Sequence, residues 1–343
     1  MRAAVFREMS KPLAIEAIAD PVPGPHDIIL RVKNCGICGS DLHMTEPSSI
    51  MPLALGSVMG HEFSGEVVAV GKNVTHLWKA GDRAAGFPFI CCGEHTPCLN
   101  FAAGKPGTCG KGISVGLGQS PGAYAEYVKI GASSGFRLPD AVSFREGAMV
   151  EPLAVGLHAV DMAKMPRGAT VLVVGAGPVG LAVMLWAKFL GARHVIVSEK
   201  AEVRKAMAAK FGATDSIDPS QPLTPQVEKI AGAGPDIIFE CVGAPGLINQ
   251  TMMEAPRGTR IVIAGVCQQP DTIMPLMGIV KELELQFVLG YRRADFDYVI
   301  AMIASDRVEV SHMITDIIDL DALPSAFEAL RKPSHQCKVM LEN

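Results

Sequence analysis

The sequence has no excess of basic charge. Its 343 residues contain 31 lysines and arginines against 35 aspartates and glutamates, a formal net charge of −4. Runs of like charge are also absent, so no segment resembles a charged tail or a membrane-surface helix. This balance argues against a nucleic-acid partner. We therefore expect small-molecule partners, with neither nucleic acid nor membrane.

The N-terminus lacks an apolar signal sequence. Residues 1–18, MRAAVFREMSKPLAIEAI, carry a charge every few positions and contain no apolar core of signal-peptide length. We therefore expect a cytoplasmic protein in a reducing compartment, where disulfide frameworks are rare. Six of the nine cysteines lie within residues 35–109. In that setting, clustered cysteines are candidates for metal binding or catalysis.

A membrane-spanning helix is not expected either. Residues 170–187, TVLVVGAGPVGLAVMLWA, are uncharged over almost the length that a bilayer requires. However, three glycines and a proline lie between Gly175 and Gly180 and would break such a helix. A strand, a turn and a helix fit this segment better.

The pattern of apolar runs changes along the chain. Up to about residue 150, short apolar runs alternate with glycine and proline, which is typical of β-structure. From about 165 to 285, apolar strands alternate with helical stretches, which indicates βαβ units and a parallel sheet. The last residues do not continue this alternation. A chain of this length is also too long for one ordinary core, so we predict two domains, 1–150 with 286–343 and 151–285.

A glycine-rich turn follows the first strand of the βαβ region. Gly175, Gly177 and Gly180 have the spacing G-x-G-x-x-G, directly after an apolar strand and at the start of an apolar helix. This arrangement lets a pyrophosphate approach the backbone N–H groups at the helix N-terminus. Glu199 ends the next strand, where an acid would hold the adenosine ribose. The motif predicts a dinucleotide cofactor; the alternative is a glycine-rich turn without a ligand.

Three separate segments carry candidate metal ligands. Cys38 lies in NCGICGSDLH, His61 and Glu62 are adjacent in MGHEF, and Glu151 begins EPLAVGLHAV. Cysteine, histidine and carboxylate together suit a catalytic zinc ion that keeps one coordination position open.

With these residues in view, the chain resembles the zinc-dependent medium-chain alcohol and polyol dehydrogenases, particularly the sorbitol and butanediol dehydrogenases. The motifs that carry the resemblance extend along the chain: CGICGSDLH (35–43), GHE (60–62), GDR (81–83), EPLAVGLHAV (151–160) and GAGPVG (175–180). The resemblance implies an α/β protein in which a GroES-like, mostly β catalytic domain is built from both chain ends. A doubly wound Rossmann domain for NAD would lie between them. It also implies a homo-oligomer, either a dimer or a tetramer.

The resemblance assigns roles to individual residues. Cys38 matches a ligand of the catalytic zinc and His61 matches a second, whereas Cys35 matches none and is expected to be a small buried residue. The third ligand is either Glu62, with Glu151 holding the zinc-bound water, or Glu151 itself. The sequence does not choose between them.

A proton relay is implied in the same way. Zinc lowers the pKa of a bound hydroxyl, which suits oxidation of an alcohol with hydride transfer to nicotinamide. Ser40 matches the relay hydroxyl and His43 the histidine that passes the proton to solvent, while Asp41 resembles an acid that orients a ligand. The alternatives are a helix-capping serine and an ordinary surface histidine.

Residues 91–109 depart from the family pattern of four cysteines. One cysteine is replaced by histidine, and the last cysteine lies three residues further along than usual. Three thiolates and an imidazole still suit a closed tetrahedral site, so we predict a second, structural zinc; the alternative is a loop without metal. The predicted ligands are Cys92, His95, Cys98 and Cys109, with Cys91 as a second choice for the first position.

These observations predict an enzyme that transfers a hydride between NAD and a secondary alcohol, diol or polyol. We expect Gly175, Gly177, Pro178, Val179, Gly180, Glu199 and Arg204 to bind the cofactor. Glu199 favours NAD over NADP because it would repel a 2′-phosphate, although Lys200 and Arg204 could compensate such a charge. Two alternatives are a zinc-free quinone or enone reductase of the same fold and a non-catalytic dinucleotide-binding protein.

Overall fold

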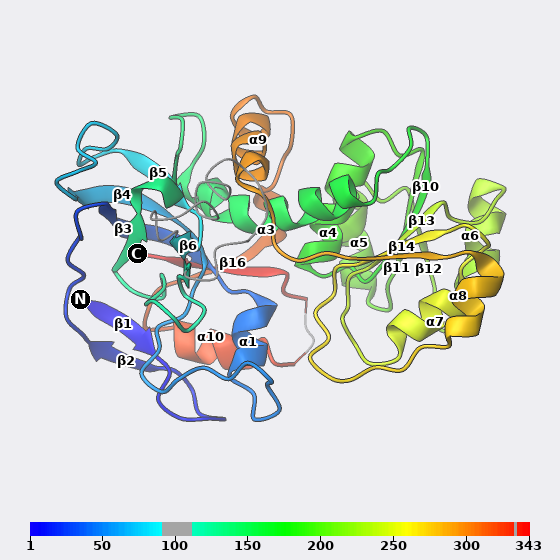
Figure 1. The fold of residues 1–343 in the computed structure, drawn as a ribbon, viewed down its shortest axis with the longest axis horizontal. Helices are drawn as coiled ribbons and strands as arrows, with labels where there is room; N and C mark the ends of the chain where they lie inside the picture. The colour runs from blue at the N-terminus through cyan, green and yellow to red at the C-terminus, as the bar shows by residue number, and fades with distance from the viewer. Residues whose placement is uncertain (91–111, 333–334) are drawn as a thin grey trace. The chain divides into compact units, whose positions relative to one another are not determined.

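The computed structural model of the protein describes residues 1–90, 112–332 and 335–343 (Figure 1). The chain divides into two compact units, one formed by Met1–Glu151 with Arg292–Asn343 and the other by Pro152–Tyr291. The first boundary falls inside helix α3 (Phe144–Met162). The second unit extends past residue 285 because strand β15 (Glu284–Phe287) pairs with its sheet.

The first unit is mostly antiparallel β-structure. Its described strands include a seven-stranded sheet in the order β16-β17-β3-β4-β5-β9, with β8 also paired to β3. Two antiparallel pairs, β1-β2 and β6-β7, complete the described strands of this unit. The bounds of these strands are β1 Arg2–Val5, β2 Ala14–Ala17, β3 Asp27–Gly36, β4 Glu62–Val70, β5 Arg83–Gly86, β6 Phe89–Ile90, β7 Ile113–Ser114, β8 Tyr127–Gly131, β9 Gly135–Arg137, β16 Ile314–Ile318 and β17 Lys338–Glu342.

Strand β3 is the centre of this sheet. It pairs with β4 along one edge, and with β8 and then β17 along the other. The pairing with β17 brings the C-terminal segment against residues 34–36, so both ends of the chain contribute to one unit (Figure 1). The first candidate ligand, Cys38, follows β3 directly, and Glu62 begins β4.

The second unit, which is described throughout, contains a six-stranded parallel sheet. Its strand order is β12-β11-β10-β13-β14-β15, the doubly wound order of dinucleotide-binding domains. The strands are β10 Thr170–Val174, β11 His194–Ser198, β12 Asp215–Ile217, β13 Ile237–Glu240, β14 Arg260–Ile263 and β15 Glu284–Phe287. All residues of β10 and β13 are buried, as expected for strands covered on both faces. The predicted Rossmann-type α/β fold is confirmed.

Helices connect the parallel strands. Helix α4 packs against β10 and β11, α6 against β11 and β12, and α7 against β13 and β14. The described helices are α1 Gly39–Met44, α3 Phe144–Met162, α4 Pro178–Phe189, α5 Glu202–Lys210, α6 Leu223–Ala231, α7 Leu247–Glu254, α8 Pro275–Lys281, α9 Arg293–Ala304 and α10 Leu323–Ala329. The uncharged residues 170–187 form β10, a turn and most of α4, and none of the described helices is long and apolar enough to cross a bilayer.

Candidate metal centre and cofactor turn

Cys38, His61 and Glu62 come together in the first unit. The sulfur, imidazole and carboxylate donor atoms all lie within 4.8 Å of one another. His61 and Glu62 are buried, while Cys38 is half-buried. In the part of the chain that the structure describes, no other group of three cysteine, histidine or acidic residues has this arrangement, and Glu151 is not a member of it.

The pairing of β3 with β4 creates this cluster. Gly36 lies opposite Glu62 in the sheet, so Cys38, two residues further on, is brought to the carboxylate. A Cβ atom at Gly36 would lie 2.1 Å from Oε2 of Glu62, so a larger residue there would displace this carboxylate. The absence of a side chain at Gly36 therefore leaves room for the Glu62 carboxylate at the end of the β3–β4 pair.

Lys338 forms a buried ion pair with Glu62. Its Nζ lies 2.6 Å from both carboxylate oxygens and also donates to the backbone oxygen of Ile37 at 3.1 Å. Both charged side chains are 1% exposed. Burial acts to lower the pKa of Lys338, but the Glu62 carboxylate outweighs burial, so the pKa is raised and the lysine stays charged.

Lys338 was not among the predicted site residues. The only sequence signal for Lys338 is that a charged residue begins the strand KVML, in which the following residues are apolar and buried. Carboxylate oxygens have several lone pairs, so Glu62 can accept from Lys338 and still offer an oxygen to a cation.

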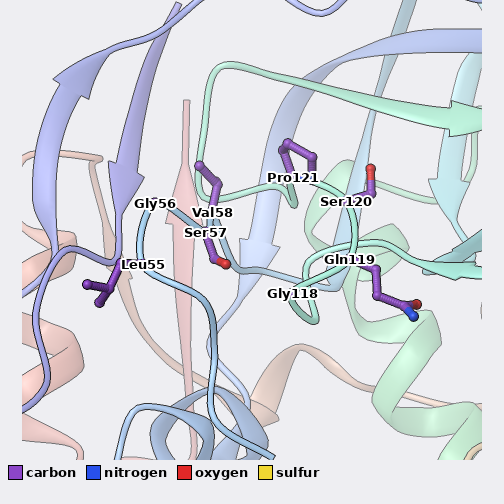
Figure 2. Close-up of a pocket in the computed structure, with 8 residues that line it drawn as sticks. All are labelled: Leu55, Gly56, Ser57, Val58, Gly118, Gln119, Ser120 and Pro121. Carbon is purple, nitrogen blue, oxygen red and sulfur yellow. The ribbon is translucent and has the colours of Figure 1, made fainter.

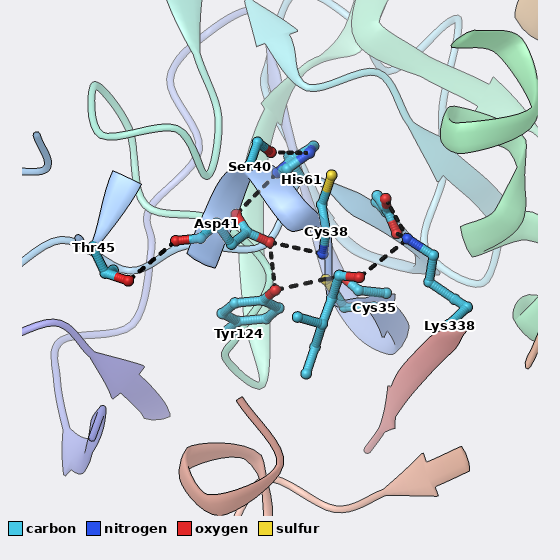
Figure 3. Close-up of polar contacts among 11 residues, drawn as sticks. Cys35, Cys38, Ser40, Asp41, Thr45, His61, Tyr124 and Lys338 are labelled. Atoms are coloured by element: carbon cyan, nitrogen blue, oxygen red, sulfur yellow. Dashed lines mark hydrogen bonds and ion pairs between the residues drawn. The ribbon is translucent and has the colours of Figure 1, made fainter. Parts of the chain in front are cut away.

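Asp41 lies beside both of the other two candidate ligands, Cys38 and His61. Its Oδ2 accepts the backbone N–H of Cys38 at 3.1 Å, and its Oδ1 lies 3.2 Å from Nδ1 of His61 (Figure 3). The other ring nitrogen of His61, Nε2, lies 3.5 Å from Oγ of Ser40. Burial acts to lower the pKa of His61, but the negative charges of Asp41 and Cys38 outweigh it and raise the pKa well above its usual value.

These residues fit a zinc ion. A thiolate, an imidazole and a carboxylate form the donor set of an open zinc site. With Nδ1 facing Asp41, Nε2 is the nitrogen that remains for a metal, which is the usual carboxylate–histidine–metal arrangement. The pKa of His61 is raised because negative charge surrounds its ring, and a bound cation would balance that charge.

The relay candidates lie on the short helix α1. Ser40 is half-buried and touches His61, whereas the His43 side chain is 50% exposed and its Nδ1 lies 3.5 Å from Oε1 of Glu46. Glu151, in α3, is 7% exposed. Ser40 therefore lies toward the donor cluster and His43 toward solvent.

The glycine-rich turn in the second unit has the geometry that phosphate binding requires. Gly175 has φ +97°, a conformation that favours glycine. A Cβ at Gly180 would lie 2.0 Å from the Gly175 carbonyl oxygen, so the helix start packs directly on the turn. At Gly177, which precedes Pro178 and Val179 at the start of α4, a Cβ would meet nothing within 4 Å. The turn thus leaves open space in front of the helix N-terminus.

Glu199 lies beside this turn. Its Oε2 accepts the backbone N–H of Ala176 at 3.1 Å, and its Oε1 accepts those of Lys200 and Ala201. The acid at the end of the second strand is therefore held next to the glycine motif. Arg204, in α5, is half-buried, and Lys200 is exposed.

Comparison with known proteins identifies the family. Residues 24–140 match the alcohol dehydrogenase GroES-like domain, and residues 178–305 match the zinc-binding dehydrogenase family. Sorbitol dehydrogenase of Gallus gallus is 32% identical over 96% of this chain and 93% of its own length. (R,R)-butanediol dehydrogenase of Bacillus subtilis is 32% identical over 96% of both chains. This chain belongs to the zinc-dependent medium-chain alcohol and polyol dehydrogenases.

Solved structures agree with this family assignment and include both cofactor types. A zinc-binding dehydrogenase from Sinorhizobium meliloti bound to NADP superposes with a TM-score of 0.88 at 29% identity, covering 100% of this chain and 99% of that one. An Escherichia coli alcohol dehydrogenase complexed with NADH gives a TM-score of 0.89 at 27% identity with the same coverage. The predicted family, GroES-like domain and Rossmann domain are confirmed.

Further features of this dehydrogenase were not predicted. Glu240, at the end of β13, is 1% exposed, and its Oε1 accepts the backbone N–H groups of Val242 and Gly243 at 2.7 and 2.9 Å. A Cβ at Gly175 would lie 2.6 Å from Val242, so Glu240 holds a loop that packs on the cofactor turn. The sequence signal that could have identified Glu240 is its place at the end of an apolar strand, like that of Glu199.

A surface cavity of about 230 Å³ lies elsewhere in the first unit. Figure 2 shows its two loops, residues 55–58 and 118–121. None of the candidate ligands or relay residues lines it.

The predicted structural zinc ligands Cys92, His95, Cys98 and Cys109 lie outside the described residues, so that site stays a prediction.

Proposed function

We propose that this oxidoreductase interconverts a secondary alcohol, diol or polyol and its ketone, with zinc and NAD. The observation that carries the proposal is the convergence of Cys38, His61 and Glu62 within 4.8 Å. The relatives' names support the substrate class, since they include a sorbitol dehydrogenase and a butanediol dehydrogenase. The direct test is zinc analysis of the purified protein together with NADH formation on a panel of diols, polyols and simple secondary alcohols.

Cys38, His61 and Glu62 would hold the catalytic zinc, and Glu151 would bind its water. When bound, zinc would polarise the substrate oxygen and lower the pKa of its hydroxyl. Ser40 would take the hydroxyl proton, and the exposed His43 would pass it to solvent. Comparing Glu62→Gln with Glu151→Gln tests the ligand choice: the direct ligand is the one whose loss lowers zinc affinity more.

NAD is the proposed cofactor. Glu199 lies beside the glycine turn, where its carboxylate would accept bonds from ribose hydroxyls and repel a 2′-phosphate. Measuring kcat/KM with NAD and NADP tests this assignment, and a wild-type preference for NADP would refute it.

Two alternative functions predict different results in the main test. A zinc-free quinone or enone reductase would turn over without metal, and a non-catalytic dinucleotide-binding protein would bind NADH without turning over any member of the panel. The assembled donor cluster favours the zinc enzyme over both. A cytoplasmic location is part of the proposal, because a reducing compartment keeps cysteines such as Cys38 as free thiols.

We also propose a homo-oligomer that forms through the edge of the second unit. Strand β15 ends the parallel sheet, and near it Phe287 and Leu289 are 64% and 86% exposed. Helix α8 exposes Leu276 and Ile279 by 61% and 73%. An edge strand next to exposed apolar side chains is a ready surface for a second copy. Light scattering should find a dimer or tetramer, and Leu289→Asp should dissociate it.

The second zinc is a separate prediction. If Cys92, His95, Cys98 and Cys109 bind metal, the wild type should contain two zinc ions per chain, and Cys109→Ser should contain one and melt at a lower temperature. One zinc in the wild type, with Cys109→Ser unchanged in metal content and stability, would show a metal-free loop.

A further inference from the structure

The hydroxyl of Tyr124 reaches the donor cluster from a different segment of the chain. Its side chain is fully buried, and its hydroxyl donates to Oδ2 of Asp41 at 2.6 Å (Figure 3). Its ring packs edge-on against Phe327, with centroids 6.5 Å apart. A buried phenol so placed has one strong polar contact, and that contact is with the acid beside two candidate ligands.

Three groups converge on the Asp41 carboxylate. Oδ2 receives the N–H of Cys38 and the hydroxyl of Tyr124, while Oδ1 lies 3.2 Å from Nδ1 of His61. Neither Oδ1 nor Nδ1 has a well-aligned hydrogen-bond partner among the described residues. The orientation of the carboxylate is therefore set at Oδ2, and that orientation decides how Oδ1 meets the imidazole.

The backbone of the same segment holds the chain just before His61. The N–H of Tyr124 donates to the Met59 carbonyl at 2.9 Å, and the N–H of Ala123 donates to the Gly60 carbonyl at 2.8 Å. Gly60 has φ +96°, and a Cβ there would lie 2.6 Å from the Tyr124 ring. Residues 123–124 thus contact both the backbone that carries His61 and the acid that faces its ring.

We propose that Tyr124 is a positioning residue for the zinc site, whose hydroxyl holds Asp41 so that His61 presents Nε2 to the metal. The proposal rests on the proposed function, in which Cys38, His61 and Glu62 bind zinc. Without the hydroxyl, Oδ2 would keep only the Cys38 N–H, and the carboxylate could rotate away from Nδ1. Groups that orient metal ligands in this way typically affect metal affinity by about 10- to 100-fold.

The test is Tyr124→Phe, which removes one oxygen and keeps the buried ring. We expect the zinc dissociation constant of the Cys38-dependent site, measured by competition with a chelator, to rise about 10- to 100-fold. The visible absorption bands of the cobalt-substituted protein should also change, because they report ligand geometry. Tyr127→Phe, the same change at a half-buried position in β8, is the matched control and should alter neither.

Two further variants separate positioning from packing. Tyr124→p-aminophenylalanine restores a donor and should recover the wild-type zinc affinity and cobalt spectrum. In an Asp41→Asn background, Tyr124→Phe should have little additional effect, because both residues act through the same contact.

The outcomes distinguish this proposal from the proposed function. Wild-type zinc affinity and cobalt spectrum in Tyr124→Phe, even with a lowered melting temperature, would show that Tyr124 only packs. Failure of the amino variant to restore affinity, or additive effects with Asp41→Asn, would overturn the proposal as well. If wild type and Cys38→Ser contain equal zinc, the proposed function itself fails, whatever Tyr124 does.

Discussion

The cofactor turn of the second unit and the donor cluster of the first are assembled over very different sequence distances. Gly175, Gly180 and Glu199 lie within residues 175–199, just after two neighbouring strands and on the helix between them. The donor cluster instead depends on Cys38, on Glu62 and on Lys338, which is 276 residues from Glu62. In addition, the charged side chains of Glu62 and Lys338 are buried as an ion pair. A local motif is thus formed by one βαβ unit, whereas the metal site needs strands β3, β4 and β17, which come from both ends of the chain.

The largest expected effect is that of Cys38→Ser, which should affect the metal site and leave the cofactor site intact. Cys38→Ser should abolish turnover because it removes the sulfur ligand, while the dissociation constant for NADH, measured by fluorescence, should stay within about twofold of wild type. A variant that still oxidises alcohols at the wild-type rate would exclude zinc catalysis. A variant that loses NADH binding would show that the two sites are not independent.

Lys338→Met tests the long-range part of the metal site. It leaves the Glu62 carboxylate buried without its cation, and breaking a buried pair in this way costs about 3–5 kcal/mol. Urea unfolding of the metal-free protein measures the loss. The double variant Glu62→Gln/Lys338→Met should recover most of the stability, because it removes the uncompensated charge. Equal instability of both variants would mean that the lysine acts through packing.

Gly180→Ala tests the local site. The new Cβ would lie 2.0 Å from the Gly175 carbonyl, so the turn must shift, and overpacking of this kind costs about 1–3 kcal/mol. NADH affinity should fall while zinc content stays unchanged. Gly177→Ala is the matched control, since its Cβ meets no protein atom. It should leave the free energy of unfolding within about 0.5 kcal/mol of wild type and weaken only NADH binding.

The smallest expected effect is that of His43→Gln. The side chain is half-exposed, so water and buffer can replace part of its relay role. Alcohol oxidation near neutral pH should slow by about tenfold or less, below the 10²–10⁴ of direct acid–base catalysis. The deficit should shrink as pH rises, because hydroxide and buffer bases then accept the proton. An unchanged pH–rate profile would assign His43 to the surface.

The sequence by itself determined the fold class, the family and the local parts of both sites. Glycine spacing and the strand before it predicted the Rossmann unit, because a βα turn is encoded by adjacent residues. Cys38, His61 and Glu62 were recognised as residue types and motifs, but spacing alone did not say which carboxylate joins them.

Only the tertiary structure decided the partners of those residues. It paired Lys338 with Glu62 and placed the hydroxyl of Tyr124 on Asp41. Neither residue belongs to a recognisable motif: Lys338 is one lysine in the apolar strand β17, and Tyr124 is one aromatic residue in the segment before β8. Their roles depend on residues that are distant in the sequence and meet only in the folded chain, where burial makes an unpaired charge or hydroxyl costly.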